Sequence, residues 1–228
     1  MEPASLMQVI SVNVGLPRTL VLNGETVVTG IFKEPVEGRI AVRRLNLDGD
    51  RQADLTVHGG QDKAIYAYPA EHYSFWHERF PEMELPWGMF GENLTLTGLL
   101  EDEVHIGDHF RVGSAKLMVT QPRLPCYKLG IKFGREDIIK RFLESGKTGF
   151  YFAVLEEGEV AAGDTVSLLQ RDEHHVQVAD IVGLYRRDKY NLDLLRRFLA
   201  VEALPEAWRE YFQHRVEKMT SSRLLREV

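Results

Sequence analysis

Apolar and polar residues alternate in many short stretches along the first two-thirds of the chain, and Gly, Pro, Asn or Asp closes most of them. Alternation with a period of two predicts half-buried strands. The predicted strands are residues 7–15, 25–32, 39–47, 54–60, 64–69, 93–98, 103–113, 115–122, 149–160 and 164–170. So many short strands, separated by turns, predict a mainly β fold of the barrel or sandwich type.

Helical periodicity appears in two segments between these strands, residues 69–80 and 135–147. Pro69 suits the first position of a helix, and Gly146 predicts the end of the second one. The apolar faces comprise Tyr73, Trp76 and Phe80 in the first segment, and Ile138, Ile139, Phe142 and Leu143 in the second. These two helices are expected at the periphery of the β structure.

The pattern changes after about residue 173, where three short amphipathic helices are predicted. They cover residues 178–189, 191–200 and 205–216. Asn191 is a natural N-cap for the second helix, and Pro205 opens the third. We therefore expect a β domain over residues 1–173 and a small three-helix domain over residues 174–228.

Composition places the chain among ordinary globular proteins. Its 228 residues include 44% hydrophobic and 27% charged ones, and the formal net charge is -6. Because nucleic-acid binders have an excess of Lys and Arg, no nucleic-acid polymer is expected as a partner. No apolar run approaches the length of a membrane span, and the N-terminal residues lack the pattern of a signal peptide. With a single cysteine, the sequence predicts a cytoplasmic protein without internal disulfides.

Several common site motifs are absent from the sequence. Gly146-Lys147-Thr148 resembles the end of a phosphate-binding loop, but Arg141 stands where that motif has its first glycine. No G-x-G-x-x-G stretch occurs, and the eight histidines have no metal-site spacing. Nucleotide binding of these types and a histidine metal site are therefore not expected.

The only cysteine, Cys126, lies in the stretch QPRLPCYKLG. Arg123 and Lys128 place positive charge near its sulfur, which favours the thiolate form. Pro122 and Pro125 stiffen the segment, so the thiol is expected on a loop. These residues leave two interpretations: a buried structural cysteine, or a thiol presented as a nucleophile or a soft-metal ligand.

Four segments, in this order, resemble the MOSC domain family: residues 49–73, 90–95, 106–130 and 149–164. The helical tail resembles the three-helix domain of the YiiM-type branch of that family, so the likeness covers nearly the whole chain. It implies a MOSC-type β-barrel with a few peripheral helices that binds a molybdopterin-type molybdenum cofactor. By the same resemblance, Cys126 is the catalytic residue and a molybdenum ligand, beside the two sulfurs of the cofactor's dithiolene.

The resemblance also suggests which residues bind the cofactor: Arg51, His58, Gly59, Gly60, Asp62, Lys63, Asn93, Arg123, Tyr127 and Lys128. Adjacent glycines let backbone approach a ligand closely, and Lys or Arg supplies charge for a phosphate. Three of these assignments have a structural alternative. Lys63 is otherwise a solvated lysine in a hairpin turn, Asn93 a turn-stabilising residue, and Arg123 a member of a surface ion pair.

The activity implied by the resemblance is the reduction of N-hydroxylated compounds, such as 6-N-hydroxylaminopurine-type bases, amidoximes and hydroxylamines. One cysteine cannot hold an iron–sulfur cluster, and the sequence has no flavin or haem pattern. Electrons are therefore expected from a separate protein, a flavin reductase or a ferredoxin-like carrier. The sequence also allows the protein to form an oligomer. The alternatives are a sulfur carrier or cofactor-handling protein that uses a Cys126 persulfide, and a non-enzymatic anion-binding module.

Overall fold

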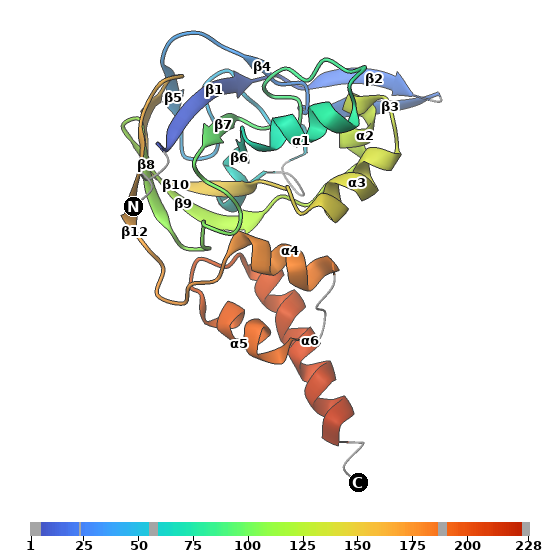
Figure 1. Ribbon diagram of the computed structural model, residues 1–228, viewed down its shortest axis with the longest axis vertical. Coiled ribbons are helices and arrows are strands. Elements are labelled where there is room, and N and C mark those ends of the chain that lie inside the picture. Colours follow the sequence, from blue (N-terminus) through green and yellow to red (C-terminus); the bar gives the residue numbers. More distant parts are fainter. Residues whose placement is uncertain (1–5, 23, 55–58, 187–190, 225–228) are drawn as a thin grey trace.

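The computed structural model describes residues 6–22, 24–54, 59–186 and 191–224, and it is built around one large, curled sheet (Figure 1). This eight-stranded sheet has the order β12-β8-β9-β10-β6-β7-β1-β4. All neighbours are antiparallel except β6 and β7. The strands are β1 (Gln8–Val14), β4 (Glu34–Pro35), β6 (Ile65–Pro69), β7 (Leu94–Thr97), β8 (His109–Val112), β9 (Ala115–Pro122), β10 (Phe150–Glu156) and β12 (Val166–Gln170).

The sheet is curled but does not close into a regular barrel. Gln8 of β1 forms an isolated antiparallel bridge with Thr165, next to β12. The amide of Val9 donates to the carbonyl of Asp164, and the amide of Val166 donates to the carbonyl of Met7. The rest of that edge of β1 pairs with β4 instead. The expected mainly β fold is therefore confirmed, whereas the strands of the described residues do not close into a complete barrel.

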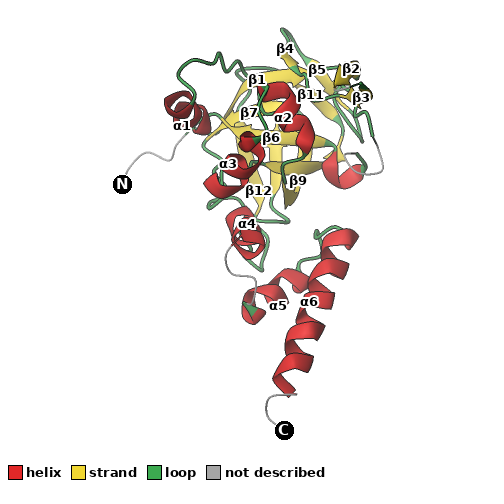
Figure 2. Ribbon diagram, turned by 90° about the vertical axis from the view of Figure 1, so that its right-hand side faces the viewer, coloured by secondary structure: helices red, strands yellow, loops and turns green. Residues whose placement is uncertain are grey.

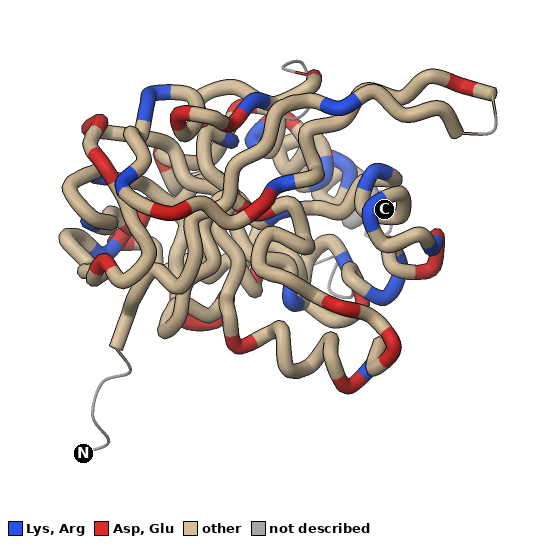
Figure 3. Tube along the Cα trace, turned by 90° about the horizontal axis from the view of Figure 1, so that it is seen from above, with Lys and Arg blue, Asp and Glu red and all other residues tan. Residues whose placement is uncertain are grey.

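Two smaller ladders complete the β structure. β2 (Arg18–Leu22) and β3 (Glu25–Thr29) form a hairpin arm that projects from the body (Figures 1 and 3). β5 (Ile40–Val42) pairs with β11 (Gly158–Val160). The sequence did not predict β2 or β4, and most of the strand predicted over residues 54–60 lies outside the described residues.

Strand β6 separates two hydrophobic cores because it is buried on both faces. Ile65 and Ala67 belong to the core inside the curled sheet. Tyr66 and Tyr68, which alternate with them, belong to a second core on the outer face. This second core is mostly aromatic. In it, the ring of Tyr68 stacks on that of Phe90 with 4.4 Å between the ring centroids.

Helices α1 (His72–Arg79), α2 (Tyr127–Phe133) and α3 (Asp137–Ser145) cover the outer face of the sheet (Figure 2). Gly146 ends α3 in the left-handed conformation, as predicted. The start predicted for α1 was wrong because Pro69 is still a strand residue that pairs with Leu96 of β7. The sequence also missed α2, which begins directly after Cys126.

The C-terminal part of the chain forms α4 (Val178–Arg186), α5 (Leu192–Ala200) and α6 (Glu206–Leu224), and α6 extends away from the sheet (Figure 1). The side chain of Asn191 accepts a hydrogen bond from the amide of Leu194, so the predicted N-cap is confirmed. Ile181 and Phe198 join the apolar core of the sheet, so the division after residue 173 stays a prediction. Every helix in the described part of the chain is too short or too polar to span a membrane.

Candidate functional site

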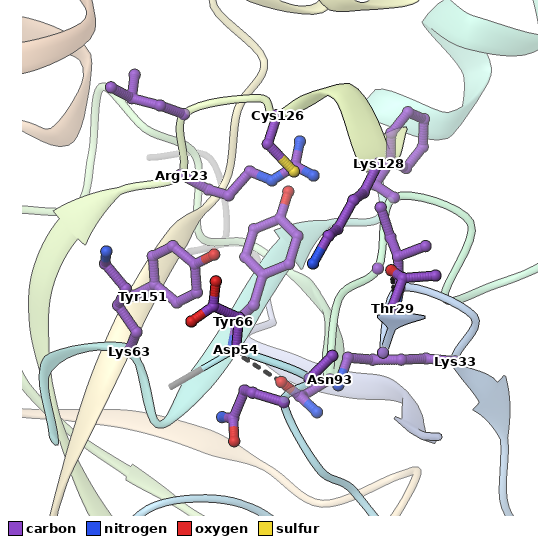
Figure 4. Close-up of a pocket in the computed structure, with 17 residues that line it drawn as sticks. Thr29, Lys33, Asp54, Lys63, Tyr66, Asn93, Arg123, Cys126, Lys128 and Tyr151 are labelled. Carbon is purple, nitrogen blue, oxygen red and sulfur yellow. Dashed lines mark hydrogen bonds between the residues drawn. The ribbon is translucent and has the colours of Figure 1, made fainter. Parts of the chain in front are cut away.

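A pocket of about 660 Å³, including its open mouth, lies between the root of the hairpin arm, the outer face of the sheet and α2 (Figure 4). Its lining comprises Thr29, Gly30, Ile31, Lys33, Gln52, Ala53, Asp54, Lys63, Tyr66, Phe90, Gly91, Asn93, Arg123, Leu124, Cys126, Lys128 and Tyr151.

Cys126 presents its thiol to this pocket from the N-cap of α2. Its backbone is extended, with φ −120° and ψ 165°, and its side chain does not cap the helix. The residue is partly exposed, and Figure 4 shows the sulfur pointing toward the guanidinium of Arg123 and the hydroxyl of Tyr66. Exposure combined with an adjacent cation is the environment that favours a thiolate.

Arg123 is a buried cation beside that thiol, with 5% of its surface exposed. Its guanidinium lies 5.4 Å from the ring centroid of Tyr66 and 4.9 Å from that of Phe142. Burial lowers the pKa of Arg123, but the nearby tyrosines and Cys126 outweigh this effect and raise it. The guanidinium therefore stays charged.

One nitrogen of this guanidinium has no hydrogen-bond partner among the described residues. Nη1 of Arg123 is fully buried and makes no hydrogen bond there. Leaving a charged donor unsatisfied costs on the order of 1–3 kcal/mol or more, so this nitrogen calls for a partner such as water or a ligand. Because the donor is cationic and lines the pocket, the arrangement suits an anionic ligand.

Two lysines lie on opposite sides of the thiol in Figure 4. Lys63 comes from the 3₁₀ turn η1 (Gln61–Lys63), and Lys128 comes from the first turn of α2. Burial lowers the pKa of Lys63, although Asp62 opposes that shift. With Arg123 and one carboxylate, Asp54, they give the pocket an excess of positive charge around the sulfur.

A buried polar network forms the base of the pocket. Asp50 pairs with Lys33, and it also accepts hydrogen bonds from the amide of Gly15 and from Nδ2 of Asn93. Oδ1 of Asn93 in turn accepts from the amide of Tyr66 at 3.1 Å. This network ties the root of the hairpin arm to β6, so Asn93 uses its amide group to hold the pocket wall.

Buried Glu92 and partly buried Lys132 lie behind this wall. Glu92 accepts hydrogen bonds from the hydroxyl of Tyr73 and from the amides of Gly88 and Phe90. Lys132 of α2 donates to the carbonyls of Ile31 and Gly88. α2, which presents Cys126, is thus fixed to the hairpin arm and to the turn before β7.

Family models match both parts of the chain. The model described as MOSC domain matches residues 54–167, and that described as YiiM-like, 3-alpha helix domain matches residues 178–218. The protein YflK of Bacillus subtilis is 44% identical over 211 residues, which are 92% of this chain and 95% of that protein. This chain belongs to the MOSC domain family.

Two further proteins extend this comparison. The crystal structure of YiiM from Geobacillus stearothermophilus has a TM-score of 0.78 and 38% identity, and the match covers 92% of this chain and 99% of that one. A protein of Gibberella moniliformis named "Reductase" is 33% identical over 197 residues, 85% of this chain and 34% of that longer protein. This MOSC protein therefore has YiiM-like architecture and a relative with a reductase name.

The structure brings some of the residues predicted from the MOSC resemblance into the pocket and leaves others outside. Cys126, Lys63, Asn93, Arg123 and Lys128 line it. The lining given by the described residues does not include Arg51, Gly59, Gly60, Asp62 or Tyr127. Tyr127 is 61% exposed, and His58 lies outside the described residues.

Sequence reasoning missed several pocket residues. The pattern predicts Tyr66 and Tyr151 only as strand residues, yet they are register partners in β6 and β10 with ring centroids 5.3 Å apart. Alternation along these strands predicts which side chains share a face of the sheet, but not which face binds a ligand. Lys33 and residues 29–31 come from the arm, before the segment that matches the MOSC model, so no motif marked them.

The stability of the wall behind the pocket is expected to depend on pH through Lys132. Burial lowers the pKa of Lys132 to about 8, with Glu92 opposing the shift. The unfolded chain therefore binds more protons between pH 8 and about 10.4, and the contribution of Lys132 to stability rises with pH there, by at most ~1.4 kcal/mol per unit. Relative to Lys132→Met, the wild type should gain stability from pH 7.5 to 9.5 in urea unfolding.

Lys140→Met is the matched control, because the Lys140 side chain is 81% exposed on α3. Its difference from the wild type should be the same at both pH values. An equally constant difference for Lys132→Met would contradict the assigned role of Lys132.

Proposed function

We propose that this protein is a molybdenum-cofactor-dependent reductase of N-hydroxylated compounds. Three findings support the proposal: the MOSC family, the YiiM-like architecture and the relative named "Reductase". The single observation that carries it is the Cys126 thiol beside a buried Arg123, whose Nη1 has no hydrogen-bond partner among the described residues.

The pocket residues fit a molybdopterin-type cofactor. Such a cofactor carries a phosphate and presents a soft metal, so it needs cationic donors and a thiolate within one cavity. Arg123, Lys63 and Lys128 would hold the anionic part, and Cys126 would bind the metal. The bound cofactor would supply the two-electron redox chemistry of the reaction.

The side chains around the thiol would control its ionisation and the position of Arg123. The guanidinium of Arg123 would favour the thiolate form of Cys126, which is the form that binds metal. The rings of Tyr66 and Phe142 fix that guanidinium from its faces. The ring of Tyr151 lies 5.3 Å from that of Tyr66, centroid to centroid, which places both tyrosines in the same wall of the pocket.

The substrates of this proposal are N-hydroxylated purines, amidoximes and hydroxylamines. Reduction of an N-hydroxyl group to an amine consumes two electrons and two protons and releases one water. The ammonium groups of Lys63 and Lys128 are proton donors within the pocket lining. We further propose that a separate protein, a flavin reductase or a ferredoxin-like carrier, supplies the electrons.

Cys126→Ala should abolish both molybdenum binding and turnover. The side chain is partly exposed and does not cap α2, so the thermal midpoint is expected to stay within a few degrees of the wild type. Molybdenum is measured by elemental analysis of protein purified from a host that makes the cofactor. Turnover is measured on 6-N-hydroxylaminopurine with an artificial reductant.

Tyr127→Ala is the neighbouring control, because Tyr127 is exposed and lies outside the pocket lining given by the described residues. It should keep both metal and turnover. Full turnover in Cys126→Ala would refute the ligand assignment. A wild type with sulfane sulfur on Cys126 and no molybdenum would favour the persulfide carrier, and metal or anion binding without turnover would favour the binding module.

Lys63→Ala should weaken retention of the cofactor without removing the thiolate. Loss of one charge-assisted contact to an anion costs about 1.5–3 kcal/mol, so molybdenum should leave on dialysis roughly ten- to a hundred-fold faster. Lys116→Ala, on β9 outside the pocket lining given by the described residues, is the control. Unchanged retention in Lys63→Ala would make Lys63 a solvated turn residue, the structural alternative.

A further inference from the structure

The amide side chain of Gln121 links the C-terminal helices to the pocket. Gln121 lies at the end of β9, two residues before Arg123, and only 4% of its surface is exposed. Its Oε1 accepts a hydrogen bond from Nε1 of Trp208 in α6 at 2.7 Å. Its Nε2 donates to the carbonyl of Asp62 at 3.3 Å. The buried amide of Gln121 thus forms one hydrogen bond to α6 and one to η1.

The carbonyl of Asp62 is the point at which the turn η1 is held. Besides Gln121, the hydroxyl of Thr120 donates to it at 2.6 Å. The next residue is Lys63, which lines the pocket. Neighbouring side chains of β9 therefore fix the turn that carries one of the pocket's cations, while the same strand leads into the segment of Arg123 and Cys126.

The position of Trp208 is set by the helices themselves. Its ring stacks on Phe212 with 5.3 Å between centroids, and Phe212 packs against Phe198 of α5 at 5.0 Å. Phe198 and Phe212 are fully buried in the core shared with the sheet. The indole N–H, and with it the orientation of the Gln121 amide, depends on how α5 and α6 pack.

We propose that Trp208 and Gln121 are positioning residues, through which the three-helix segment fixes the turn carrying Lys63 at the pocket. The expected effect on the retention of an anionic cofactor rests on the proposed function. The coupling itself depends only on the hydrogen-bond chain Trp208–Gln121–Asp62. A preformed cation binds an anion more tightly because less ordering is needed on binding.

Trp208→Phe and Gln121→Met test this chain in the full-length, cofactor-free protein. Trp208→Phe removes the N–H and keeps a ring on Phe212, whereas Gln121→Met removes both hydrogen bonds at similar volume. A hydrogen bond contributes about 1 kcal/mol, so amide hydrogen exchange over residues 59–66 should become about fivefold faster in each variant. Exchange elsewhere in the sheet should not change.

Tyr211→Phe is the matched control, because Tyr211 lies on the same helix and is 46% exposed. It should leave exchange over residues 59–66 unchanged. The double variant Trp208→Phe/Gln121→Met should be no faster than Gln121→Met alone, since both residues act through one carbonyl. Unchanged exchange at residues 59–66 in both single variants, or a uniform increase over the whole protein, would overturn the proposal.

Molybdenum retention is the second readout. Both variants are purified from a host that makes the cofactor and are then dialysed. The Trp208→Phe variant should lose molybdenum about threefold faster than the Tyr211→Phe variant. Equal rates would overturn the claim that the chain positions Lys63 for the cofactor. A wild type without molybdenum would contradict the proposed function instead, and the exchange measurement would still decide whether the coupling exists.

Discussion

The site depends on a buried guanidinium held next to the only thiol of the chain. Removing a cation from water costs several kcal/mol unless neighbours replace its hydration. Around Arg123, the rings of Tyr66 and Phe142 and the sulfur of Cys126 supply that replacement. Nη1 is not satisfied by the described residues, so the protein keeps a cationic donor available at the pocket.

Much of the surrounding structure keeps this guanidinium in place. The sheet buries β6 on both faces, which requires a second, aromatic core, and the helices α1, α2 and α3 supply it. The same core provides Tyr66 and Phe142 to the guanidinium. On the other side of the pocket, Asp50 joins Lys33 to Asn93, and the hairpin arm is thereby fixed against β6. The aromatic core and the polar network together form the walls of the cavity.

The sequence predicts most strands and five of the helices because their periodicity is strong, as the apolar face of α3 and the Asn191 cap illustrate. It misses α2, which has seven residues and contains Gly130 and Ile131, so its helical pattern is weak. The motifs identify Cys126, Arg123 and Lys63 as pocket residues. They do not identify Tyr151, Lys33 or the Trp208–Gln121 contact, because these depend on how distant segments pack.

The central claim is that Cys126 joins a molybdenum centre in this pocket. X-ray absorption at the molybdenum edge tests it most directly, on wild-type protein purified from a host that makes the cofactor. The proposed site predicts a sulfur neighbour of the metal beyond the two of the cofactor's dithiolene. A metal surrounded by the dithiolene sulfurs alone, or fully formed cofactor in the host with no molybdenum in the protein, would contradict it.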